Sequence, residues 1–146
     1  MFQVEAEARA VLAGLKDLAR RQLVRFELAV APGLAIDGDE TALRAILTEL
    51  TVHAARRAAG GRVLVAASHN GRFAEIAVCD DARGGGQWLE ADLRSARQLA
   101  VALGGTLEAS PGNEGTIVMF RVPGARGGPD QAKRDEASVA SSARSK

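Results

Sequence analysis

Hydrophobic positions at helical and strand spacing divide the first sixty residues into three elements. Apolar residues recur every three or four positions near the N-terminus, which predicts a helix over about 3–20. From 24 to 30 apolar and polar residues alternate, the period of a half-buried strand, and Pro32–Gly33 closes it. Asp39 can cap a second helix, which ends at Gly60–Gly61. The apolar stripe of this helix consists of Leu43, Ile46, Leu47, Leu50 and Ala54.

The second half is predicted to contain two hairpins separated by one helix. Arg62–Ser68 and Arg72–Cys79 flank Asn70–Gly71, a dipeptide that tolerates the positive φ angles of a tight turn. A third helix is predicted over about 89–103, and the last hairpin pairs 106–110 with 116–122. The order α-β-α-β-β-α-β-β predicts an α/β chain of the α+β two-layer kind, with three helices on one face of a five-stranded mixed sheet.

The polar C-terminal stretch is predicted to lie outside the folded domain. Residues 1–123 form one predicted domain, whereas 124–146 are mostly small and charged residues, which bury too little to offset the entropy of ordering them. We expect this tail to be disordered. No apolar run is long enough to cross a membrane and no secretory signal is visible, so a cytoplasmic location is expected. A single cysteine, Cys79, excludes an intramolecular disulfide.

The charge balance argues against nucleic acid as a partner. The chain has 19 basic and 18 acidic residues, and the predicted domain alone is slightly acidic. A protein that holds a phosphate backbone needs a basic face, which this balance does not supply. We therefore expect neither a nucleic-acid nor a membrane partner.

Four short segments carry a resemblance to a known family. They are Glu49–Ala54, Ile76–Gly84, Leu99–Ser110 and Gly115–Pro123. Their order and separation resemble the catalytic ATP-binding domain of sensor histidine kinases, which has the Bergerat-like fold of the histidine-kinase-like (GHKL) ATPases. The resemblance covers the chain from about residue 22 to Pro123.

The first segment is similar to the family's N box, and this implies roles near the phosphates. Glu49 takes the acidic position and is the catalytic candidate if the domain is active. His53 stands where the family has a magnesium-binding asparagine, and Arg56 stands where a basic residue often reaches a phosphate. Three interpretations of His53 stay open: a structural histidine at the core edge, a residual metal or nucleotide ligand, and a phosphoacceptor whose charge Arg56 and Arg57 balance.

The second and fourth segments imply an adenine-binding end. Asp80 fits the aspartate that accepts a hydrogen bond from the adenine amino group, and Thr116 fits the threonine that approaches adenine through water. Ala82 replaces the first glycine of the family's Asp-x-Gly-x-Gly motif, whereas Gly84 retains the second. The strand period supports Asp80 independently, because its position is in phase with the apolar positions of its strand. Its carboxylate should therefore point inward at the strand end.

The phosphate-binding end departs from the family pattern. Counted back from Gly104–Gly105, the two glycines of the family's phosphate loop fall on Glu90 and Asp92. Glycine lets backbone N–H groups approach a triphosphate, whereas two carboxylates repel it. The alternative is that both acids simply favour the start of a helix. The stretch Gly84–Leu89 is also shorter than the lid that the family closes over ATP.

The sequence therefore predicts a degenerate histidine-kinase-like domain that acts in bacterial two-component or phosphorelay signalling mainly through protein contacts. Binding of ATP or ADP is expected to be weak or absent, magnesium is doubtful, and the chain alone is not expected to be an enzyme. The resemblance implies a histidine kinase, a receiver domain or a phosphotransfer domain as partner, and a homodimer stays open. The alternative is a competent ATP-binding catalytic domain of a histidine kinase or an anti-sigma-type serine kinase.

Overall fold

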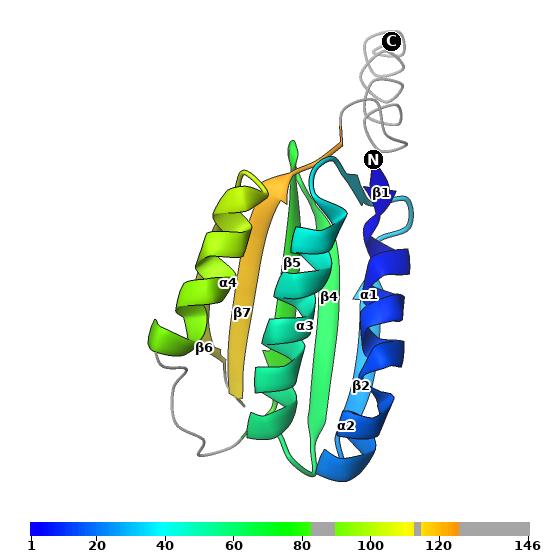
Figure 1. Cartoon of the computed structure of the whole chain (residues 1–146), viewed down its shortest axis with the longest axis vertical. Coiled ribbons are helices and arrows are strands. Elements are labelled where there is room, and N and C mark those ends of the chain that lie inside the picture. The colour runs from blue at the N-terminus through cyan, green and yellow to red at the C-terminus, as the bar shows by residue number, and fades with distance from the viewer. Residues whose placement is uncertain (83–89, 113–114, 126–146) are drawn as a thin grey trace, which may run out of the picture.

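Helices and strands lie in two separate layers (Figure 1). The computed structural model describes residues 1–82, 90–112 and 115–125. The predicted α+β two-layer class, with a five-stranded mixed sheet, is confirmed. In chain order the elements are β1 (Phe2–Gln3), α1 (Val4–Gly14), α2 (Lys16–Gln22), β2 (Arg25–Val30), β3 (Ala35–Ile36), α3 (Glu40–Arg57), β4 (Arg62–Asn70), β5 (Phe73–Asp80), α4 (Glu90–Ala102), β6 (Thr106–Gly112) and β7 (Gly115–Pro123).

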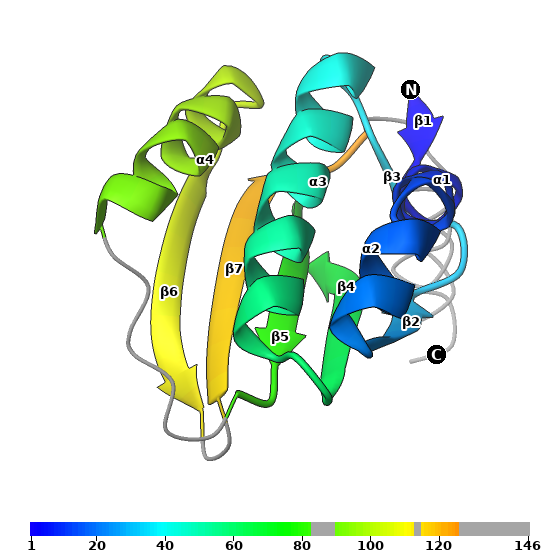
Figure 2. The same cartoon turned by 60° about the horizontal axis from the view of Figure 1, so that its bottom comes forward.

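The strand order brings distant segments to one end of the sheet. The order is β2-β4-β5-β7-β6, with β2 parallel to β4 and the other neighbours antiparallel. Because β5 and β7 run antiparallel, the last residues of β5 lie beside the first of β7, and Cys79 is opposite Ile117. The start of β4 lies there too, since Val63 is opposite Asp80. Figure 2 shows that the C-terminal end of α3 lies over this same end of the sheet.

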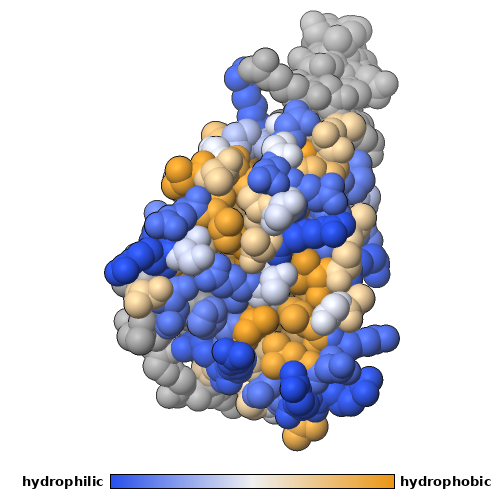
Figure 3. Space-filling model, viewed as in Figure 1, coloured by the Kyte–Doolittle hydropathy of each residue, from blue (hydrophilic) through white to orange (hydrophobic). Residues whose placement is uncertain are grey.

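Helix α3 is the centre of the helical layer, between α1 and α4 (Figure 1). Asp39 caps it as predicted, because its Oδ1 accepts hydrogen bonds from the backbone N of Thr41 at 2.9 Å and of Ala42 at 3.3 Å. The predicted apolar stripe of α3 is buried and packs on the sheet. The core includes Leu43, Ile46 and Leu50 of α3, Val63 of β4, Ile76 of β5 and Phe120 of β7. On the outer side of this layer, apolar side chains show mainly along the seams between helices (Figure 3).

The first predicted helix is in fact two helices, so the described residues form four helices and not the three expected. Leu15 separates them with φ −105° and ψ 13°, and its N–H donates to the carbonyl of Leu12, three residues back. Glycine is a poor helix former, which explains why α1 ends at Gly14. Among the described residues, no helix is both long and apolar enough to cross a membrane.

A second, two-stranded sheet joins the N-terminus to the end of the last strand. β1 pairs antiparallel with β3, and Ile36 of β3 forms a bridge with Gly124. The N–H groups of Gly124 and Ala125 donate to the carbonyls of Arg72 at 2.7 Å and Ala35 at 3.0 Å. The hydrogen-bonded chain thus continues two residues past the predicted domain boundary. Residues 126–146 lie outside the described part of the chain, and their disorder stays a prediction.

Candidate functional site

A buried carboxylate lies where β5 ends. Asp80 is the last residue of β5, and its side chain is 1% exposed. It follows the buried Ala74, Ile76 and Val78 at every second position, as the alternation of a strand requires. The inward orientation expected from the sequence is therefore confirmed. A carboxylate removed from water to this extent needs hydrogen-bond donors around it.

Both oxygens of Asp80 have donors within the chain. Its Oδ1 accepts from the backbone N of Ala82 at 3.1 Å and of Thr116 at 3.3 Å. Its Oδ2 accepts from Nε of Arg57 at 3.3 Å, and the two charges form an ion pair. The carboxylate expected to receive an adenine amino group is thus already held by this protein's own donors.

Arg57 also contacts the second residue assigned to adenine. It is the last residue of α3, its side chain is 18% exposed, and its Nη2 donates to Oγ1 of Thr116 at 3.2 Å. One guanidinium therefore bridges Asp80 and Thr116, which the sequence places 36 residues apart. Sequence reasoning considered Arg57 only as a charge near His53. The helical period could have identified it. Arg57 lies seven residues, or two turns, after the buried Leu50, so both side chains are on the inner side of α3.

The start of β7 is pressed against Asp80. Gly115 has a φ of +118°, which residues with a side chain rarely adopt. A Cβ at this position would collide with the backbone of Asp80 and would lie 2.8 Å from its Oδ1. Glycine is therefore required here, and its absence of a side chain lets Thr116 N reach the carboxylate.

The two residues beside Asp80 have different environments. Asp81 Oδ1 accepts from the backbone N of Arg62 at 2.9 Å, which ties the end of β5 to the start of β4. Burial raises the pKa of the Cys79 thiol, and the charge of Asp80 adds to this effect. Cys79 is therefore a protonated, poorly nucleophilic thiol at neutral pH.

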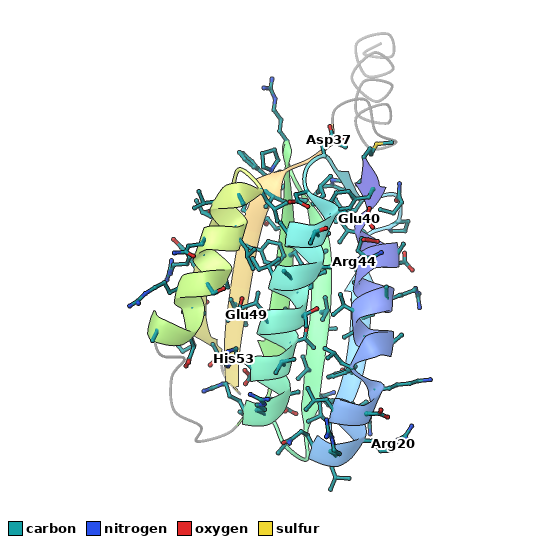
Figure 4. The ribbon with its side chains drawn as sticks, viewed as in Figure 1. Arg20, Asp37, Glu40, Arg44, Glu49 and His53 are labelled. Carbon is teal, nitrogen blue, oxygen red and sulfur yellow. The ribbon has the colours of Figure 1, made fainter. Side chains whose placement is uncertain are left out.

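The residues of the predicted N box lie on two sides of α3. Glu49 and His53 are half-buried and are one helical turn apart. Figure 4 shows both on the side of α3 that faces α4. Arg56 is exposed and does not share the inner side with Arg57. The structure thus brings Asp80 and Thr116 together, places Glu49 and His53 on one side of α3, and leaves Arg56 on the surface.

The structure describes part of the region that the resemblance assigns to the phosphates. α4 begins at Glu90, and Asp92 lies half-buried in its first turn. Acids in a first turn interact favourably with the helix dipole, as the alternative interpretation of these residues holds. Gly84, the shortened lid over 84–89 and the side chain of Glu90 lie outside the described residues.

The described donors fit a magnesium ion poorly. Within 1–82, 90–112 and 115–125, no group of three or more His, Cys, Asp or Glu side chains is placed to hold a metal ion. Glu49 and His53 would offer one carboxylate and one imidazole. Magnesium is a hard cation that prefers oxygen ligands, so an imidazole in place of an amide oxygen weakens such a site.

Solved structures share this fold. The nucleotide-free catalytic domain of histidine kinase ThkA aligns with a TM-score of 0.75 at 15% identity, over 84% of this chain and 94% of that one. Full-length ShkA in complex with AMPPNP gives 0.73 at 23% identity, over 85% and 30%. ThkA in complex with the response regulator TrrA gives 0.73 at 16% identity, over 85% and 41%.

These likenesses establish the fold. No protein-family model matches the sequence. No curated protein matches it either. The chain nevertheless has the architecture of histidine-kinase catalytic domains over more than four fifths of its length.

Proposed function

We propose that this chain, with the fold of a histidine-kinase catalytic domain, is a signalling domain that acts through contacts with other proteins and binds ATP or ADP weakly or not at all. The observation that carries the proposal is the set of side chains at the phosphate end. His53 in α3 and Asp92 in the first turn of α4 stand where the resemblance implies an asparagine and a glycine. A carboxylate repels a triphosphate, and an imidazole does not replace an amide oxygen on magnesium.

The proposed partners are proteins of two-component or phosphorelay signalling: a histidine kinase, a receiver domain or a phosphotransfer domain. Their support is that ThkA, which shares the fold, has been solved in complex with a response regulator. This chain covers 41% of that ThkA chain, so the proposal concerns the domain and not the activity of a whole kinase. Binding of the chain to a purified receiver domain, measured by calorimetry, tests this part.

Thermal unfolding with and without nucleotide tests the proposed weak binding. A ligand at a hundred times its Kd raises the free energy of unfolding by about 2.7 kcal/mol. A site with a Kd of about 10 μM would therefore raise the melting temperature by several degrees at about 1 mM ATP with magnesium. We expect no saturable rise with ATP or with ADP. Saturable binding at low micromolar ATP would refute the proposal.

A competent ATP-binding domain of a histidine kinase or an anti-sigma-type serine kinase is the second candidate. Glu49 favours it, because this acid is half-buried on the side of α3 that faces α4 (Figure 4). A further support is that ShkA, which shares the fold, binds AMPPNP. The same titration separates the two candidates, since this one requires a saturable effect of ATP. Loss of that effect in Glu49→Gln would then assign the acid to the site.

A further inference from the structure

Arg57 covers two side-chain groups, a carboxylate oxygen of Asp80 and the hydroxyl of Thr116, that could together recognise a ligand. Asp80 Oδ2 accepts from Arg57 Nε, and Thr116 Oγ1 accepts from Arg57 Nη2. Without the guanidinium, one carboxylate oxygen and one hydroxyl would lack these donors at the inner end of β5 and β7. A carboxylate accepts from an amino group, and a hydroxyl both donates and accepts. An aminopurine offers an exocyclic amino donor next to a ring-nitrogen acceptor, so its edge matches this pair.

We propose that Arg57 is the specificity-determining residue of this site: its guanidinium binds Asp80 Oδ2 and Thr116 Oγ1, the two atoms that an aminopurine edge would contact, and keeps the base out. The inference rests on the proposed function, and its assignment of Asp80 and Thr116 to a base comes from the resemblance to histidine-kinase catalytic domains. It goes further because it concerns the base-binding end, whereas the proposed function is carried by the phosphate end. Asp80 and Thr116 are both present, and the side chain of Arg57 binds both of them.

The burial of the ion pair makes Arg57 an effective block. Asp80 is 1% exposed and Arg57 is 18% exposed, so water screens their attraction weakly. A base that takes the place of the guanidinium replaces a charged donor to Oδ2 with a neutral amino group. Charge-assisted hydrogen bonds are roughly twice as strong as neutral ones, so the exchange is unfavourable. An aminopurine therefore loses the competition for Asp80 in the native protein.

Adenosine binding by Arg57→Ala tests the proposal. Adenosine carries no phosphate, so the acids at the start of α4 and His53 in place of the family's magnesium-binding asparagine do not affect the result. We expect Arg57→Ala to bind adenosine at least about tenfold more tightly than the native protein in a calorimetric titration, because one charged competitor is removed. Inosine has a carbonyl oxygen in place of the amino group, which the Asp80 carboxylate repels. Its affinity for Arg57→Ala should not rise.

Arg56→Ala is the matched control, because adenosine has no phosphate that Arg56 could reach. It removes the same charge and the same side chain from the preceding residue of α3, but Arg56 is exposed. Its adenosine affinity should equal that of the native protein. The native circular dichroism spectrum and a cooperative unfolding transition confirm that each variant is folded.

Arg57→Lys is the variant to measure if Arg57→Ala does not fold. It keeps a cation beside Asp80 but gives up the fork that reaches Thr116, so a gain of at least about threefold for adenosine is expected. A folded Arg57 variant without a gain overturns the inference, as does an equal gain in Arg56→Ala or with inosine. If the native protein also fails to bind ATP, the proposed function survives that outcome. Tight ATP binding by the native protein would instead refute the proposed function.

Discussion

At the scale of single residues, the contact between Gly115 and Asp80 shows how little freedom the end of β7 has. The positive φ of Gly115 and the closeness of its Cα to Asp80 are two independent reasons for glycine. Together they position Thr116, whose backbone N and hydroxyl both take part in the contacts around the carboxylate.

Gly115→Ala should lower the free energy of unfolding by about 2–5 kcal/mol. The left-handed conformation costs a residue with a side chain about 1–2 kcal/mol, and overpacking against Asp80 adds about 1–3 kcal/mol. Urea unfolding followed by circular dichroism measures the loss. Gly14→Ala is the control, because its added Cβ at the end of α1 would meet no atom within 4 Å beyond its chain neighbours and the backbone of its own helix. That variant should be as stable as the native protein or up to about 1 kcal/mol more stable.

Residue patterns predicted the direction of Asp80 but not its partner. The strand period alone places this carboxylate on the buried side, because alternation is a local property. Which donor meets it depends on how α3, β5 and β7 come together, and this is not local. Arg57 and Thr116 are 59 residues apart in the chain, so no spacing rule connects them.

At the scale of elements, an ion pair between a buried glutamate and an exposed arginine joins α1 to α3. Glu7 is 6% exposed and accepts from Arg44 Nε at 2.7 Å and from Nη2 at 3.3 Å, a two-pronged contact. Figure 4 labels Arg44 on the side of α3 that faces α1, near Glu40. The hydrogen bonds from Arg44 hold the pKa of Glu7 below its ordinary value, against the opposite effect of burial.

This pair should contribute to acid unfolding. A carboxylate with a lowered pKa stabilises the folded state fully above its unfolded pKa of about 4.3, and the contribution is lost as the pH falls through the lower folded pKa. Glu7→Gln should therefore be less stable near neutral pH and lose less stability between about pH 5 and pH 3. Thermal unfolding across this range measures both effects. An unchanged loss of stability between about pH 5 and pH 3 in Glu7→Gln would contradict the assignment.

Element prediction succeeded where one period extended over several turns or residues. The stripe of α3 and the two hairpins have such periods, and Asp39 adds a cap signal. The sequence did not predict the break at Leu15 or the pairing of β1 with β3. A single interrupted turn and a two-residue strand are too short to show a period.

At the scale of the whole molecule, backbone hydrogen bonds hold Gly124 and Ala125, the last residues that the structure describes. The backbone bonds of Gly124 and Ala125 to Arg72 and Ala35 join the turn between β4 and β5 to the small sheet. Removal of 126–146 should leave the melting temperature unchanged, because we expect that segment to be disordered. Removal of 124–146 takes away two backbone hydrogen bonds as well and should cost about 1–3 kcal/mol. Equal melting temperatures for the two truncated chains would contradict this expectation.

The global strand order was not predictable from the sequence. Two hairpins are local and were expected, but β7 lies between β5 and β6, and this depends on which strand of the second hairpin meets the first. Either strand has apolar residues at alternate positions, so periodicity does not distinguish them. The location of the candidate site at the joint of β5 and β7 follows from that choice.

The pairing of β5 with β7 also affects the order in which the elements fold. The β4–β5 hairpin closes around a turn at Gly71, whereas β7 must find β5 across the whole of α4 and β6. Long loops are entropically harder to close, so we expect the β5–β7 pairing to form later than the hairpin. The contacts of Asp80 with Arg57 and Thr116 would then form only in the final steps of folding. In a chain that has not yet paired β5 with β7, Asp80 would be exposed to solvent.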